Sequence, residues 1–203
     1  MLAPCDGAIQ IIGDQIIKER IQLLQSTLVM SGISPKNFPF DWLVSTDYFR
    51  APASKKFHAA YPGGLYEHSL NVTYKLLQFT EAGLCSPWGR PESPIIVGML
   101  HDATKIGRYA EFKGVNQDTG EMEIFYKDNP DYVNLGGHGN DSVLKLKQVM
   151  RLTEEEELCI RYHMGAYETD DWDDFDKAIR KFPNVLFTHT ADMYASKCME
   201  VTP

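Results

Sequence analysis

Residues 95–107 have the sequence IIVGMLHDATKIG, in which a hydrophobic run ends in a histidine and an aspartate, His101 and Asp102. Pro94, just before the run, is typical of the first turn of a helix, where its missing N–H costs little. Lys105 lies three residues after Asp102 and four after His101, so on a helix its side chain shares a face with both. The stretch therefore predicts a helix that carries an imidazole, a carboxylate and an ammonium to one spot, a combination that suits a metal-bound phosphate.

The rest of the chain is predicted to be mainly helical. Two signals predict further helices: apolar residues that recur about every 3.6 positions, and residues typical of a helix start. They place helices at about 7–30, 64–82, 138–151, 154–165 and from 183 onward. Thr153 and Glu156 have the spacing of a capping box, which begins one of these helices. Residues 121–126 alternate between polar and apolar after a turn-like stretch at 116–120, which predicts a β-hairpin within 108–130. We expect an all-α fold, a helical bundle with a small inserted β-hairpin.

Length and composition predict one domain of ordinary size. The 203 residues are 43% hydrophobic and 24% charged, as in globular chains that bury a substantial core. We expect a single domain over residues 1–203, with an N-terminal helix and loop to about residue 54 and a core at about 55–200. No apolar run approaches the ~20 residues that span a bilayer, and the first residues lack the pattern of a signal peptide. We expect a cytoplasmic protein with no membrane partner.

Charge and cysteine usage argue against several classes of site. The net charge is −8 without a basic stripe, so long nucleic acid is not expected as a partner, whereas a small phosphorylated molecule needs only a metal and a few cations. The four cysteines are scattered without a Cys-x-x-Cys pair, so we expect reduced thiols and neither a thiolate zinc site nor a disulfide framework. The acidic run at 169–176 lacks the central glycine and terminal glutamate of a calcium loop, and we expect a solvated loop there.

Further residues of metal-ligating type lie in or beside predicted helices, namely His68, His138, His163 and Asp192. Asp192 is flanked by residues suited to a helix interior, where a carboxylate is costly unless it is paired or bound to a metal. His189, three residues earlier, could orient Asp192, form a core hydrogen bond or lie at the surface. A single histidine on a helix is more often structural than a ligand, so these residues gain meaning from their order along the chain.

The order of these residues resembles the H…HD…D signature of the HD-domain metal-dependent phosphohydrolases, carried here by His68, His101, Asp102 and Asp192. His138 and His163 lie between the pair and the final aspartate, which resembles the members that bind two metals. Residues 57–70, FHAAYPGGLYEHSL, are similar to the HD region of bacterial 3′–5′ exoribonucleases and of some conjugation relaxases. Taken together, the resemblance covers roughly residues 55–200. Ala103 and Thr104 stand where many members carry an apolar residue and a glycine.

The resemblance implies a ligand set. One metal would be held by His68, His101, Asp102 and Asp192, and Asp102 would bridge to a second metal held by His138 and His163. Nitrogen and oxygen donors without thiolate favour one or two divalent ions among Mn, Fe, Zn, Co and Ni. Lys105 would neutralise charge on the phosphoryl oxygens, which makes Lys105 and Asp102 the expected catalytic residues. His58 and Arg108 are candidate substrate-binding residues, with a solvated surface position as the alternative for each.

The function implied is hydrolysis of a phosphoester by a metal-bound hydroxide. The expected substrate is a nucleotide or a short oligonucleotide, and both mono- and diesters fit. The first ~50 residues leave no room for the RNA-binding OB-fold domain of the exoribonucleases, which favours a small nucleotide. Two alternatives from other classes are a nucleotide-binding regulatory module without turnover and a di-iron oxygenase. The pattern specifies no oligomeric state.

Overall fold

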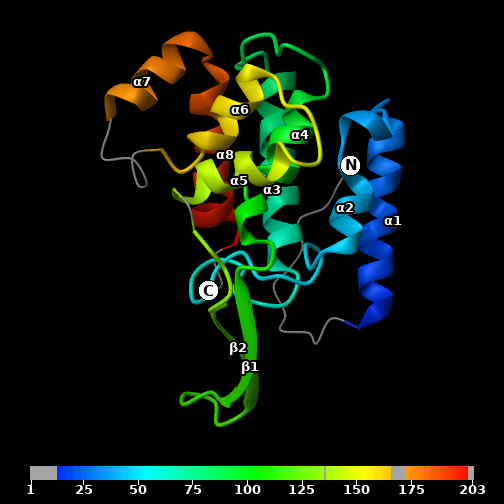
Figure 1. Ribbon diagram of the computed structural model, residues 1–203, viewed down its shortest axis with the longest axis vertical. Coiled ribbons are helices and arrows are strands. Elements are labelled where there is room, and N and C mark those ends of the chain that lie inside the picture. The colour runs from blue at the N-terminus through cyan, green and yellow to red at the C-terminus, as the bar shows by residue number, and fades with distance from the viewer. Residues whose placement is uncertain (1–12, 135, 166–171, 201–203) are drawn as a thin grey trace.

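The structure, a computed structural model, describes residues 13–134, 136–165 and 172–200. The described chain is mostly helical and contains one two-stranded antiparallel sheet (Figure 1). Its helices are α1 (Asp14–Met30), α2 (Phe40–Ser45), α3 (Gly64–Glu81), α4 (Ser93–Leu100), α5 (His138–Leu146), α6 (Glu154–Arg161), α7 (Trp172–Lys181) and α8 (Asn184–Tyr194). Within the described ranges, none of these helices has the length and apolar character needed to cross a membrane.

Helix α4 lies at the centre of the bundle. Every one of its residues is buried, as expected for a helix that is apolar on all sides. It packs against α3 and α6, and α8 in turn packs against α3 and α6. A Cβ at Gly98 would lie 2.4 Å from Thr73 Oγ1 and 2.5 Å from Thr73 Cα, so α3 and α4 approach too closely for any side chain at this position. The close packing places the C-terminal end of α4 beside the N-terminal half of α3.

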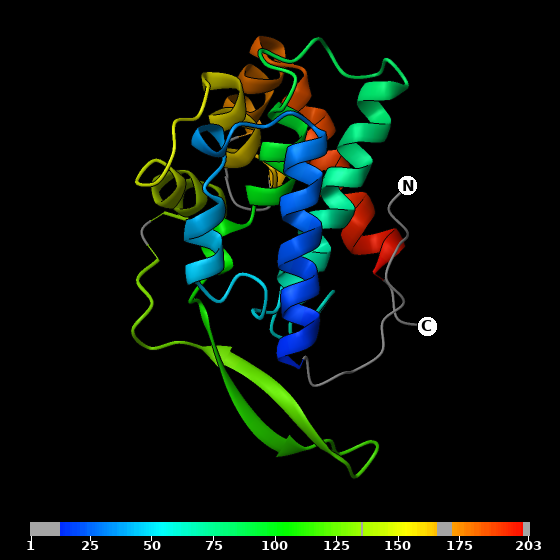
Figure 2. The same ribbon diagram turned by 90° about the vertical axis from the view of Figure 1, so that its right-hand side faces the viewer.

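The β-hairpin projects from one end of the helical body in both views (Figures 1 and 2). Strands β1 (Tyr109–Val115) and β2 (Met122–Asp128) pair antiparallel, with Tyr109 opposite Asp128 and Val115 opposite Met122. At the base of the hairpin, Asn129 N donates a hydrogen bond to Arg108 O at 2.9 Å. The predicted hairpin is therefore confirmed, and its base lies next to the His-Asp turn.

A buried polar cluster joins the beginning of α4 to the beginning of α6. The Glu156 carboxylate is fully buried and accepts hydrogen bonds from Arg90 Nε at 2.8 Å and from Arg90 Nη2 at 2.7 Å. It also accepts from Ser93 Oγ at 2.8 Å and from Thr153 N at 2.9 Å. The Thr153 side chain accepts in return from Glu156 N, so the predicted capping box is present. This cluster fixes how the two helices start relative to one another.

Several predicted helix bounds are wrong. Helix α4 ends at Leu100, so the His-Asp pair lies just beyond the helix, and Lys105 lies in a 3-10 turn, η2 (Ala103–Lys105). Helices α5 and α6 end a few residues earlier than predicted. The prediction of a solvated loop at 169–176 is wrong for residues 172–176, which begin α7 with acidic residues that suit the positive end of the helix dipole. Residues 169–171 and the predicted helical residues 7–12 lie outside the described part.

The cysteines of the described part of the chain lie at separate places in the fold. Cys85, Cys159 and Cys198 are free thiols, and Cys5 lies outside the described part. Burial raises the pKa of the Cys159 thiol, which keeps it protonated and unreactive.

Candidate metal centre

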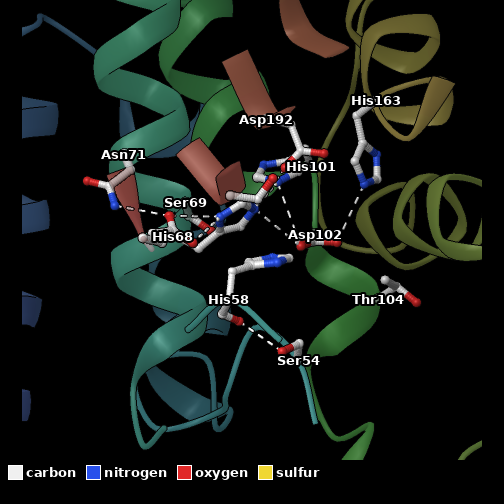
Figure 3. A network of polar contacts seen from close by, with 12 residues as sticks. Ser54, His58, His68, Ser69, Asn71, His101, Asp102, Thr104, His163 and Asp192 are labelled. Atoms are coloured by element: carbon white, nitrogen blue, oxygen red, sulfur yellow. Dashed lines mark hydrogen bonds and ion pairs between the residues drawn. The ribbon is translucent and has the colours of Figure 1, made fainter. Parts of the chain in front are cut away.

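Side chains from separate elements meet at one buried point inside the bundle (Figure 3). They are His68 from α3, His101 and Asp102 from the turn after α4, His163 from the turn after α6, and Asp192 from α8. All five are buried, although they span 125 positions of the chain. Burial of this many ionisable groups is costly unless they satisfy one another or bind an ion.

The Nε2 atom of His68 lies at the centre of the group. It is 3.1 Å from Asp192 Oδ1, 3.2 Å from His101 Nε2 and 3.7 Å from Asp102 Oδ2. The ligand atoms of His68, His101 and Asp102 all lie within 4.8 Å of one another, so these three residues could hold a metal ion. Nitrogen and carboxylate oxygen donors suit a divalent transition metal better than calcium or magnesium.

The two oxygens of Asp102 face different partners. Oδ2 lies 3.7 Å from both His68 Nε2 and His101 Nε2, whereas Oδ1 lies 3.5 Å from His163 Nε2. Within the described part of the chain, Asp102 Oδ1 and His163 Nε2 make no hydrogen bond although both atoms are buried. Buried polar atoms are nearly always hydrogen-bonded, so this pair is left with an unmet requirement that a cation would satisfy.

The three imidazoles are oriented by their Nδ1 atoms. His101 Nδ1 lies 2.8 Å from Gly98 O, and His163 Nδ1 lies 2.6 Å from Ile160 O. Because a carbonyl oxygen only accepts, each of these Nδ1 atoms carries a hydrogen and donates. In the neutral ring the hydrogen is then absent from Nε2, whose lone pair faces the centre of the group. Both carbonyls lie three residues earlier at a helix end, where backbone acceptors lack helical partners.

A carboxylate performs the same role for His68. Glu200 Oε1 and Oε2 lie 3.0 and 3.1 Å from His68 Nδ1, and Asn71 Nδ2 donates to Glu200 Oε1 at 3.0 Å. The Glu200 side chain is 5% exposed. A carboxylate that accepts from the outer nitrogen of a ligand histidine fixes the ring and strengthens it as a donor. We identify Glu200 as a residue that positions His68.

The group is strongly attractive to positive charge. Burial alone would raise the pKa of Asp192, but its hydrogen bond with His68 and the other histidines lower it to about 2. Burial would likewise raise the pKa of Asp102, yet Lys105 and His163 hold it well below its usual range. Burial opposes charge on His68, but Glu200 and Asp192 raise its pKa well above the usual value. The carboxylates thus stay ionised and hold a proton on His68, a proton that a metal ion would displace.

His101 differs from its neighbours. Burial lowers its pKa to about 4, and the adjacent His163 and His68 act in the same direction, against the opposing effect of Asp102. The ring is therefore neutral at physiological pH, which is the form that binds metals.

The other predicted site residues lie around this centre. Lys105 is buried, and its ammonium makes no hydrogen bond or ion pair with the described residues. The half-buried ring of His58 lies 4.8 Å from the ring of His68 (Figure 3). His138 is the half-buried first residue of α5. Among the described residues two groups of three could hold a metal ion, His68 with His101 and Asp102, and His68 with His58 and Glu200, and neither includes His138. Its role as a ligand stays a prediction.

For His189 the structure shows the hydrogen-bonding alternative, and it adds one residue that the sequence did not single out. The ring of His189 donates through Nδ1 to His163 O at 2.7 Å, so it supports the turn that carries His163. Glu200, which the sequence did not single out, follows a π-helical turn, Ala195–Met199, that continues α8. A signal for it exists in hindsight, because Glu200 lies about two helical turns after Asp192 and so on a similar side. π-Helical turns are frequent at functional sites.

The positioning role of Glu200 predicts a change in metal affinity. Glu200→Ala is expected to weaken divalent metal binding about 10- to 100-fold, because His68 loses the acceptor that orients it. Glu200→Gln retains an acceptor oxygen and should lose less. Competition with a chromogenic chelator measures both effects, and Glu81→Gln, an exposed change at the end of the same helix as His68, is the matched control. Equal affinities for wild type and Glu200→Ala would show that Glu200 has no such role.

The helical bundle therefore brings three imidazoles and two carboxylates to one buried point, with a further carboxylate behind one of the rings. The donor set fits a divalent metal ion on chemical grounds. The chemistry of the site is inferred from its own residues. Comparisons of the chain with protein-family models, with curated proteins and with solved structures found no match.

Proposed function

We propose that this chain is a metal-dependent phosphohydrolase of the HD-domain type, which cleaves a phosphoester of a small phosphorylated substrate, foremost a nucleotide. The observation that carries the proposal is the convergence of three buried Nε2 atoms and two ionised carboxylates on one point. Its support also includes the order of the ligands along the chain and the lysine that follows the His-Asp pair.

The metal would be held by His68, His101, Asp102 and Asp192. Because Asp102 turns its second oxygen toward His163, a second metal on that side would share this carboxylate. His138, the remaining ligand of the family pattern, would complete that side. A bound divalent metal of this kind lowers the pKa of a water molecule and offsets charge on phosphoryl oxygens.

The protein's own groups would bind and orient the phosphate. The buried ammonium of Lys105 lies close enough to Asp102 to lower the pKa of that carboxyl, and it has no acceptor among the described residues. It is therefore placed to bind a phosphoryl oxygen beside the metal ligands. Burial lowers the pKa of His58, and the neighbouring His68 lowers it further, so its neutral ring can accept or donate one hydrogen bond to the substrate.

The preference for a small substrate follows from the charge of the chain. A net charge of −8 opposes a long polyanion, whose binding depends on many Lys and Arg contacts along its backbone. A single phosphorylated molecule needs only the metal and the cations next to it.

Metal analysis and a substrate screen test the proposal together. Protein purified without chelator should contain one or two divalent metals per chain, and two metals would support the His163 side. With Mn, Fe, Zn, Co or Ni it should hydrolyse a nucleotide, p-nitrophenyl phosphate or bis(p-nitrophenyl) phosphate, lose activity in chelator and regain it on metal addition. Tight nucleotide binding without turnover for any metal would favour a binding module instead. Activity that requires oxygen would favour an oxygenase. Failure to bind any metal would contradict the proposal.

A further inference from the structure

A tyrosine next to the metal centre carries two cationic side chains on its ring. Arg108 Cζ lies 5.7 Å and Lys145 Nζ lies 4.6 Å from the centre of the Tyr132 ring. The Tyr132 hydroxyl lies 2.8 Å from Thr104 O and 2.9 Å from Thr104 Oγ1. Thr104 follows Asp102 by two residues, so the backbone that presents the candidate metal ligand also anchors this ring.

The guanidinium of Arg108 has an unmet hydrogen-bonding requirement. Its Nη1 atom is buried, and the described residues offer it no hydrogen-bond acceptor. A buried charged donor without an acceptor is costly, and such groups in folded proteins call for an explanation. The backbone of Arg108 is held on both sides, because its N–H donates to Lys105 O at 3.1 Å and its carbonyl accepts from Asn129 N at 2.9 Å. The backbone from which this side chain extends is therefore held at the base of the hairpin.

Lys145 adds a second cation at the same ring. Its ammonium donates to Ile106 O at 2.6 Å, and an ammonium has three hydrogens, so two donors remain. Burial lowers the pKa of Lys145, and the nearby Arg108 acts in the same direction, against the opposing effect of the Asp47 and Asp141 carboxylates. The two cations therefore repel each other in this half-buried place, as expected where an anion is to be bound.

A third cation, Lys105, lies between these two cations and the metal centre. Its N–H donates to Asp102 O at 2.9 Å, and its own carbonyl accepts from Arg108 N at 3.1 Å, so Lys105 lies between the candidate ligand and Arg108. Within the described ranges, Lys105, Arg108 and Lys145 make no ion pair within 4.0 Å, whereas Arg90, which is also half-buried, is paired with Glu156. A chain with net charge −8 thus keeps three unpaired cations on one side of its candidate site.

We propose that Arg108 and Lys145, placed by the ring of Tyr132, bind a second phosphate group, adjacent to the one at the metal centre, so that the substrate is a diphosphate compound such as a nucleoside di- or triphosphate. This inference rests on the proposed function for the role of the first phosphate. The planar guanidinium offers paired donors that match phosphate oxygens, and the ammonium adds a compact charge. The Tyr132 hydroxyl donates its hydrogen to Thr104 O, so the tyrosine ring places the two cations and the hydroxyl adds no further donor.

Nucleotide titrations test the second phosphate site. Adenosine diphosphate should bind the Mn²⁺-loaded protein at least about tenfold more tightly than adenosine monophosphate. This affinity ratio is the one expected for one added charged hydrogen-bonding group. Arg108→Gln should reduce this preference to about threefold or less and leave monophosphate affinity nearly unchanged. Lys145→Gln, on a different element, should act in the same direction and serves if Arg108→Gln does not fold. Lys113→Gln, exposed on β1 of the same hairpin, should keep the full preference.

The outcomes separate this inference from the proposed function. Metal-dependent hydrolysis by a protein without preference for the diphosphate would overturn the inference and leave the function standing. A preference that Arg108→Gln and Lys145→Gln abolish, without hydrolysis of any ester, would support the second phosphate site and overturn the function. Tight binding of a dinucleotide in place of adenosine diphosphate would overturn the inference, because the second phosphate would then lie across a nucleoside.

Discussion

Asp102→Ala is expected to remove metal binding and hydrolysis together. Asp102 is the carboxylate that faces both sides of the centre, with Oδ2 toward His68 and His101 and Oδ1 toward His163. Its loss removes a direct ligand, so metal affinity should fall by more than about 100-fold. Loss of a residue that only hydrogen-bonds to a ligand lowers metal affinity by up to about 100-fold. Metal content after dialysis and titration calorimetry measure the loss, and turnover of the best substrate from the screen should fall to background.

His101→Ala is the informative comparison for Asp102→Ala. It removes a ligand on the His68 side and leaves the Asp102–His163 side in place, so a protein with two metals should lose mainly one. Asp102→Asn preserves shape and serves as the control for folding, with an unfolding midpoint close to that of wild type. Retention of full metal content by Asp102→Ala would show that the metal, if present, binds elsewhere.

Arg90→Ala is expected to reduce the free energy of unfolding by about 3–5 kcal/mol, the cost of leaving a buried charge without its partner. The Glu156 carboxylate is fully buried and accepts two hydrogen bonds from Arg90, at 2.8 and 2.7 Å. Ser93 and the Thr153 N–H remain as donors, but neither carries charge. Urea unfolding at neutral pH measures the change.

Arg180→Ala is the matched control for Arg90→Ala. Arg180 also pairs with a carboxylate at 2.7 Å, that of Asp176, but both side chains are more than half exposed. An exposed ion pair of this kind contributes about 0.3–0.5 kcal/mol. Equal losses for the two variants would contradict the view that burial of Glu156 decides the effect. Replacing Arg90 and Glu156 together with methionine should cost less than Arg90→Ala alone, because no unpaired charge is left behind.

The sequence predicts the framework of this fold because its signals are local. The capping box at Thr153 and Glu156 and the alternation of residues 121–126 depend on neighbours along the chain, and both elements are present. The end of α4 was predicted less well. An unbroken apolar run gives no helix-end signal, and the helix stops at Leu100, just before the buried candidate ligands His101 and Asp102. For residues 172–176, charge density suggested a loop, although acidic residues are equally suited to a helix start.

The candidate site was predictable where chemistry is visible in residue type. Histidines and a helix-interior aspartate stand out in the sequence, and the structure gathers His68, His101, Asp102, His163 and Asp192. Contacts between distant segments were not predictable. The approach of Glu200 to His68 joins residues 132 positions apart and depends on a π-helical turn. The pairing of Arg108 and Lys145 on one tyrosine ring likewise exists only after α5 packs against η2.

The three candidate ligand histidines differ in whether a substitution can remove the acceptor that orients the ring. His101 and His163 are held by main-chain carbonyls, which every residue possesses, so no substitution at Gly98 or Ile160 deletes the acceptor itself. His68 is held by a side chain, that of Glu200. One codon change at position 200 can therefore adjust the donor strength of a single ligand while the other two keep theirs. A substitution at Glu200 would therefore change the metal affinity of the candidate centre and leave all five candidate ligands in place.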